Sequence, residues 1–435
     1  MVNGQPLDDK KVSRGMGIAV VLLVISVLIN YIDRGNLSIA ASRIQDELSI
    51  SPAQLGLLLS AFFWTYASFQ LVSGWLVDRF NVNWVMAIGF LLWSGATSVT
   101  GLAHGLVGLF AARLLLGMGE SVAYPSYSKI FANHLPEYRR GFANSAIAAG
   151  LSLGPALGLL GGGVLIARFG WRPFFIVLGL VSMLWVPTWY VFMPRGPSLE
   201  GVEGKHVGPG ILEILEQRSL WGSCGGLFCV NYVSYFLILW LPYYLTRERH
   251  FPNGKMVVYG AMVYLMSSVF ATLCGWLSDR WIAAGRTPTV VRKGFMTAGM
   301  LLSALFLVWA VVAGAKLEIP LLLLAGAAYG VSASNTWAIT QALAGPKAAG
   351  KWTGFQNFLG NMAGIVTGTL TGGILNHTHR FFWAFTATAI FALIAVICYV
   401  YIVGPIEEAR WRSIAAGDPR GDQSPGAVTK ITDMA

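Results

Sequence analysis

Apolar segments long enough to cross a lipid bilayer recur along almost the whole chain. A helix needs about 20 apolar residues to span the hydrocarbon core, and twelve segments meet this length: 16–40, 52–77, 83–103, 105–132, 141–166, 172–193, 219–245, 256–278, 294–314, 319–344, 352–376 and 381–404. The 435 residues are 55% hydrophobic and 11% charged, whereas soluble domains carry about a quarter charged residues. We therefore predict an all-α membrane protein with twelve transmembrane helices, which excludes a water-soluble enzyme.

The basic residues predict how the chain crosses the membrane. With both termini in the cytoplasm, 19 Lys and Arg residues lie on the cytoplasmic side and eight on the other, as the positive-inside rule requires. We therefore expect a multi-pass protein of the cytoplasmic (inner) membrane with both termini cytoplasmic. Because topology accounts for the net charge of +10, we expect the lipid bilayer as a partner and no nucleic acid.

The two halves of the chain repeat one another. The stretch from Asn30 to Arg34 returns as Asn231 to Tyr235, and Gly74 to Arg79 returns as Gly275 to Arg280, each 201 residues later. Such a duplicated six-span unit is typical of alternating-access transporters. We predict two six-helix bundles related by pseudo-two-fold symmetry. The expected segments are a cytoplasmic tail (1–15), an N-terminal bundle (16–193), a cytoplasmic linker (194–218), a C-terminal bundle (219–405) and a disordered cytoplasmic tail (406–435).

Several motifs resemble those of a known family. The repeated Gly74-x-Leu76-x-Asp78-Arg79 resembles the helix 2–3 loop of the major facilitator superfamily. The stretches 30–38, 113–120 and 354–357 resemble its anion:cation symporter family, which includes D-galactonate, hexuronate and glucarate carriers and sialin-type carriers. The resemblance covers about 16–404. It implies the major facilitator fold and proton-coupled symport of a small organic anion, such as a hexonate, hexuronate or glucarate.

Four charged residues lie well inside the predicted spans. Asp33 and Glu120 are the acids found well inside them, and Arg34 and Arg113 lie at similar depth. A charged side chain at that depth needs a partner, a water-filled cavity or a proton. One interpretation is a static charge lock between helices, and the other is an acid that titrates as the cavity opens. The family resemblance implies proton coupling for the two acids, and binding of the anion or of the acids for the two arginines.

Aromatic, hydroxyl and amide side chains predict a polyol site beside these charges, because sugar hydroxyls need several convergent donors and acceptors. The candidates are Tyr31, Tyr66, Tyr124, Asn231, Tyr232, Ser334, Thr336, Trp337 and Asn357. Any one of them has an alternative role in helix–helix hydrogen bonding or as an interfacial aromatic. The resemblance places Tyr31, Tyr66, Ser334, Thr336, Trp337 and Asn357 at substrate contacts.

One position departs from the relatives. Leu151 stands where galactonate-type members have a glutamine that binds a sugar hydroxyl. An apolar side chain there removes two hydrogen-bonding groups, so Leu151 is a candidate specificity residue that favours a less hydroxylated or differently oriented carboxylate.

The remaining motifs concern gating and cofactors. Asp78-Arg79 and Asp279-Arg280 are expected to form salt bridges that hold a gate between the halves, with a purely topological role as the alternative. No phosphate-binding Gly-x-x-x-x-Gly-Lys-Ser/Thr loop occurs, which argues against ATP-driven pumping. We expect no metal, no cofactor and a monomer. The alternatives to a proton symporter are an exchanger or exporter of a related carboxylate and a non-transporting membrane sensor.

Overall fold

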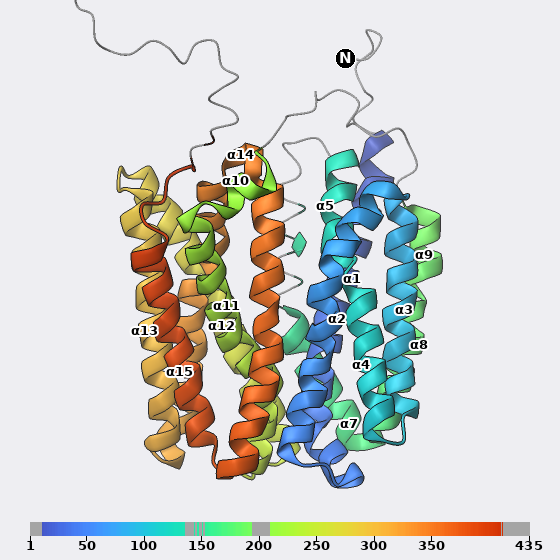
Figure 1. Cartoon of the computed structure of the whole chain (residues 1–435). Helices are drawn as coiled ribbons and strands as arrows, with labels where there is room; N and C mark the ends of the chain where they lie inside the picture. The colour runs from blue at the N-terminus through green and yellow to red at the C-terminus, as the bar shows by residue number, and fades with distance from the viewer. Residues whose placement is uncertain are drawn as a thin grey trace, which may run out of the picture.

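The computed structural model describes residues 11–134, 143, 146, 147, 150, 153–193, 209–409 and 411, and leaves the side chain of Asp78 undescribed. The chain is helical throughout these residues (Figure 1). In the first half the helices are α1 (Lys11–Leu48), α2 (Pro52–Arg79), α3 (Val82–Leu102), α4 (Leu106–Glu120), α5 (Ala123–His134), η1 (Gly158–Gly162), α7 (Gly163–Phe169), α8 (Trp171–Met183) and α9 (Trp185–Phe192). In the second they are α10 (Ile211–Leu215), α11 (Arg218–Arg247), α12 (Asn253–Ala283), α13 (Pro288–Val312), α14 (Ala315–Thr378), α15 (Phe381–Ile397) and η3 (Cys398–Ile402).

The predicted membrane spans correspond closely to these helices. Among the described residues, 11 helices are long and apolar enough to cross a membrane. The fifth predicted span, 141–166, appears as the shorter apolar helix Leu153–Phe169, and most of its first part lies outside the described residues. The prediction of an all-α membrane protein is therefore confirmed.

Two of the predicted spans form one continuous helical run, α14, with a kink at Gly345. The backbone there has φ of +61°, in the left-handed region that favours glycine. A Cβ at this position would also lie 2.2 Å from a carboxylate oxygen of Glu408. Glycine therefore permits the turn between the span that ends at 345 and the one that starts at 350.

Glycine residues let the two halves approach closely where α2 packs against α14. A Cβ at Gly56 would lie 2.4 Å from the carbonyl oxygen of Gly368, and a Cβ at Gly364 would lie 2.3 Å from the ring of Phe63. Small residues at such crossings allow direct backbone contact between membrane helices. Further along α2, Gln70 approaches Asn357 at 3.4 Å.

The halves also meet at the end of the bundle where α1 ends and α2 begins, which we call the α1–α2 end (bottom of Figure 1). There Ser38 of α1 donates a hydrogen bond to the carbonyl oxygen of Ile238 of α11 at 2.8 Å. In α7, Gly163 leaves space for Val257 of α12, which a Cβ would meet at 2.1 Å. The described chain begins and ends at the opposite end of the bundle (Figure 1).

The first residues of the predicted C-terminal tail pack against the bundle. The backbone N–H of Ile406 donates to the Thr289 hydroxyl at 2.9 Å, and that of Ala409 donates to the Leu343 carbonyl at 2.9 Å. Trp411 is buried, with its ring 6.3 Å from that of Trp352. Residues 406–409 and 411 therefore lie against the second half, and the rest of the predicted tail, 410 and 412–435, lies outside the described residues.

Candidate functional site

A buried ion pair joins α1 to α4 in the middle of the first half. Arg34 donates from Nε to Glu120 Oε2 at 2.9 Å, and the two side chains are 4% and 0% exposed. Close packing of α4 places Glu120 there, because a Cβ at Gly117 would lie 2.2 Å from the carbonyl oxygen of Phe62. Helix α4 ends at Glu120 and a new helix begins at Ala123, so the carboxylate stands at a break within one span.

Aromatic rings surround the Arg34 guanidinium. Its central carbon lies 4.3 Å from the ring centre of Tyr66, 4.7 Å from that of Tyr31 and 5.1 Å from that of Phe62. The Arg113 guanidinium lies 5.3 Å from the same Phe62 ring. Rings at these distances attract a cation through their quadrupoles. They hold both guanidinium groups in place while leaving nitrogen atoms available, since Arg34 Nη2 and two nitrogens of Arg113 have no hydrogen-bond partner among the described residues.

Asp33 is the second buried acid, and its charge lies close to those of Arg113 and Glu120. The side chain is 2% exposed. Neither of its oxygens has a fully formed hydrogen bond to any residue that the structure describes, although Thr97 and Asn36 lie beside it. A buried carboxylate without a hydrogen-bonded partner is costly when ionised. In its ionised form Asp33 therefore depends on the nearby charge of Arg113.

The second half presents a network of neutral polar groups toward this cluster. The Tyr235 hydroxyl donates to Asn361 Oδ1 at 2.6 Å, and Asn361 donates in turn to Asn357 Oδ1 at 3.0 Å. Asn357 reaches across to Gln70 of α2. Tyr235 belongs to the surroundings of Arg34, and its ring lies 4.4 Å from that of Phe63. Among the predicted candidates, Asn357 therefore joins the two halves.

Sequence reasoning missed Tyr235 and Asn361. A signal for Tyr235 existed, because the 201-residue repeat aligns Tyr235 with Arg34. Two neighbouring candidates face elsewhere. Tyr232 stacks on Phe391 of α15 with ring centres 3.9 Å apart, and Asn231 donates to the Gly360 carbonyl within the second half. Both serve helix packing, the alternative role considered above.

The other predicted polyol-site residues divide into two groups. Tyr31 and Tyr66 flank Arg34, and Tyr124 of α5 lies beside Tyr31. The three candidates on α14 diverge. Ser334 faces α12, where it lies 3.6 Å from the Cβ position of Gly275. Thr336 is buried beside Tyr399 of η3, and Trp337 is 41% exposed. The structure therefore brings the first-half candidates together and spreads those of α14 around their helix.

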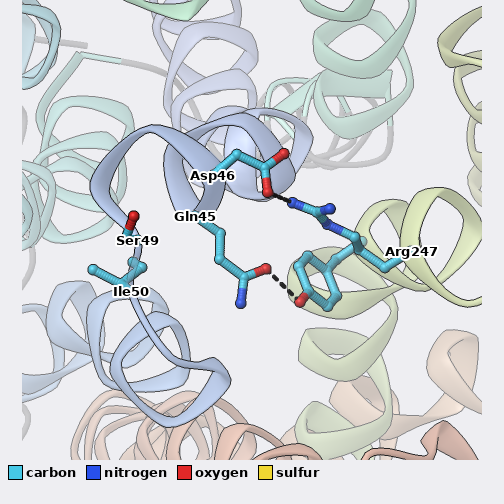
Figure 2. A pocket seen from close by; sticks show the side chains of 6 residues that line it. Gln45, Asp46, Ser49, Ile50 and Arg247 are labelled. Atoms are coloured by element: carbon cyan, nitrogen blue, oxygen red, sulfur yellow. Dashed lines mark hydrogen bonds and ion pairs between the residues drawn. The ribbon is translucent and has the colours of Figure 1, made fainter.

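Among the described residues, an ion pair links the halves at the α1–α2 end, away from the predicted gating motifs. Arg247 of α11 pairs with Asp46 of α1, and Tyr243 donates to Gln45 at 2.6 Å (Figure 2). These side chains line a pocket together with Ser49 and Ile50. Asp46 and Arg247 are separated by 201 residues, the offset of the repeat. This ion pair, which we call the Asp46–Arg247 lock, therefore joins equivalent positions of the two halves.

The predicted gating residues lie at the other end of the bundle. Arg79, Asp279 and Arg280 are exposed, and the Arg280 guanidinium lies 5.3 Å from the ring of Trp276. None of these three forms an ion pair with a described residue, and the side chain of Asp78 lies outside the description, as does Leu151. No group of three or more potential metal ligands occurs among the described residues.

Comparison with known proteins finds a family whose profile this chain matches. The profile of the Major Facilitator Superfamily matches residues 23–366. A probable galactarate/D-glucarate transporter of Bacillus subtilis is 30% identical over 89% of this chain and 92% of its own. The hexuronate transporter of Bacillus subtilis is 29% identical (88% and 94%), and a D-galactonate transporter of Escherichia coli is 28% identical (92% and 99%).

A solved structure matches the fold. A bacterial homologue of the human lysosomal transporter Spinster, inward-facing and unoccupied, aligns with a TM-score of 0.77 at 19% identity, covering 89% of this chain and 96% of that one. The predicted fold class and the resemblance drawn from the sequence motifs are confirmed by these comparisons.

Proposed function

Because the chain belongs to the Major Facilitator Superfamily, and is thus a membrane transporter rather than an enzyme, we propose that it carries a sugar-acid anion together with protons. The observation that carries this proposal is the buried Arg34–Glu120 pair beside Asp33, facing neutral polar groups of the other half. The relatives that transport hexuronate, galactonate and galactarate or glucarate support the substrate class.

The mechanism follows from what each charged group can do. A guanidinium stays charged in a dry cavity and its fork binds a carboxylate with two parallel hydrogen bonds. When a substrate carboxylate binds Arg34, Glu120 loses its ion-pair partner. It then takes up a proton, since the ionised form of an unpaired buried carboxylate is unstable. Arg113 lies near both Glu120 and Asp33, so its charge acts on both acids of the same half. Substrate and proton thus bind together.

Proton coupling also accounts for uptake of an anion. Moving one negative charge into a cell with a negative interior costs about 2.3 kcal/mol for every 100 mV, and a co-transported proton removes that cost. We place both termini in the cytoplasm, so the α1–α2 end faces outward. The Asp46–Arg247 lock then closes the outer side, and Asp78, Arg79, Asp279 and Arg280 would close the inner side in the alternate state.

The test is uptake into proteoliposomes that contain the purified chain. With an acidic exterior and a neutral interior, labelled D-galactonate, D-glucuronate or D-glucarate should accumulate above its external concentration. Asp33→Asn and Glu120→Gln should each abolish accumulation while exchange across preloaded vesicles survives. The matched control is Glu47→Gln, whose carboxylate pairs with Arg172 at the α1–α2 end, and it should accumulate normally. Gradient-driven accumulation at the wild-type level in both acid variants would refute the coupling role.

A further inference from the structure

The buried basic side chains that the structure describes, Arg34 and Arg113, both belong to the first half of the protein. Arg34 contributes the guanidinium that borders the second half, with Nη2 lacking a hydrogen-bond partner among the described residues. The charge of Arg113 is shared between Asp33 and Glu120, its acidic neighbours within the first half. Arg34 is therefore the buried cationic group, among the described residues, that borders the second half.

Among the described side chains, the second half offers no cation near Arg34. The basic side chains that the structure describes between 209 and 409 lie at helix ends or in the connecting segments, as with Arg247 and Lys351. The second-half group near Arg34 is instead the Tyr235 hydroxyl of α11, which donates to the Asn361 amide of α14, and Asn361 donates in turn to the Asn357 amide. These are donors and acceptors suited to hydroxyl groups rather than to a carboxylate.

The balance of the four buried charges in the first half also favours a ligand with one carboxylate. Arg34 and Arg113 balance Asp33 and Glu120 when both acids are ionised, so one added proton leaves one uncompensated positive charge. That charge matches one carboxylate. A second carboxylate would lie against the neutral Tyr235–Asn361–Asn357 network, where an ionised group out of water has no counter-charge.

We propose that the site selects sugar acids with a single carboxylate, the carboxylate on Arg34 and the hydroxyl-bearing end on the Tyr235–Asn361–Asn357 network. Aldarates, with a carboxylate at both ends, are rejected. This inference rests on the proposed sugar-acid function and separates two groups of relatives, the transporters of galactarate or glucarate and those of hexuronate or galactonate.

Matched pairs of ligands provide the test. D-gluconate and D-glucarate differ only at carbon 6, as do D-galactonate and galactarate, so each pair isolates the second carboxylate. Thermal shift of the purified full chain is measured across a concentration series, since stabilisation grows with ligand concentration over Kd. In each pair that the chain binds, the monocarboxylate should have a Kd at least tenfold lower than its aldarate.

The outcomes distinguish failure of the proposed selectivity from failure of the proposed sugar-acid transport. An aldarate that binds as tightly as its monocarboxylate, or more tightly, overturns the selectivity while leaving sugar-acid transport intact. A chain that binds none of the four acids or D-glucuronate overturns the proposed function and with it this inference.

A variant tests the assigned position directly. Asn357→Lys places a cation on the network and should lower the ratio of the aldarate Kd to the monocarboxylate Kd at least fivefold within each pair. The matched Asn357→Gln should leave this ratio unchanged. A lysine variant that folds and keeps the wild-type ratio would contradict the placement of the hydroxyl-bearing end. The comparison of pairs on the wild-type chain stands whether or not the variants fold.

Discussion

Replacing Arg247 by glutamine removes the ion pair that joins the two halves at the α1–α2 end. Arg247 pairs with Asp46 and also donates to the Ser42 carbonyl oxygen at 2.7 Å. Both partners lie on α1, in the other half of the protein. The substitution should therefore destabilise the state closed at this end and leave each half intact.

The magnitude follows from the exposure of the pair. The side chains of Arg247 and Asp46 are 36% and 67% exposed, so their ion pair is worth about 0.2–1 kcal/mol. The bond to the Ser42 carbonyl adds about 0.5–1.5 kcal/mol. Losing both amounts to about 0.7–2.5 kcal/mol, which shifts the equilibrium about three- to sixtyfold toward the state open at this end. Asp46→Asn, which removes only the charge pair, should shift it about fivefold or less.

Distances between spin labels on the two halves report this equilibrium. Labels at Ser49 and Glu248, both exposed residues at the α1–α2 end, should give a longer distance when this end opens. The ratio of long to short distances should rise strongly in Arg247→Gln and weakly in Asp46→Asn. Glu47→Gln is the matched control, because Glu47 bonds Trp171 and Arg172 within its own half. A wild-type distribution in Arg247→Gln would refute the reasoning.

Three further predictions concern binding, closure and specificity. Arg34→Lys keeps the charge but loses the fork, so apparent affinity for a sugar acid should fall at least tenfold; undiminished affinity in both Arg34→Lys and Arg113→Lys would place the anion elsewhere. Gly56→Val should block closure against Gly368, whose carbonyl oxygen lies 2.4 Å from the Cβ position, and abolish transport; normal turnover would contradict this. Leu151→Gln should shift competition toward galactonate, about tenfold for each 1.4 kcal/mol recovered, and an unchanged preference would remove Leu151 from the site.

Hydropathy predicted the helices well because a bilayer requires long apolar segments whatever surrounds them. The four buried charges were also easy to identify from the sequence, since a charge within an apolar segment requires a partner. In the structure Arg34 finds this partner in Glu120. The sequence does not show which face of each helix points into the protein. A face buried in the protein and a face in contact with lipid are both apolar, so the two cannot be told apart by hydropathy.

The missed residues show this limit. Tyr232 and Tyr235 stand one helical turn apart on α11, yet Tyr232 packs on Phe391 while Tyr235 approaches Arg34. Only the rotation of α11 within the bundle distinguishes them. The lock between Asp46 and Arg247 depends on two helices 201 residues apart meeting at one end. The repeat makes the two positions equivalent, but their contact depends on which side of the protein is closed.

Proton movement accompanying substrate movement tests the central claim most directly. Proteoliposomes holding a pH-sensitive dye inside, with no imposed gradient, receive an external monocarboxylic sugar acid such as D-galactonate or D-gluconate. The account predicts internal acidification that follows substrate uptake, is independent of sodium, and disappears in Glu120→Gln although that variant still exchanges substrate. Uptake without acidification, or acidification that persists unchanged in Glu120→Gln, would contradict it.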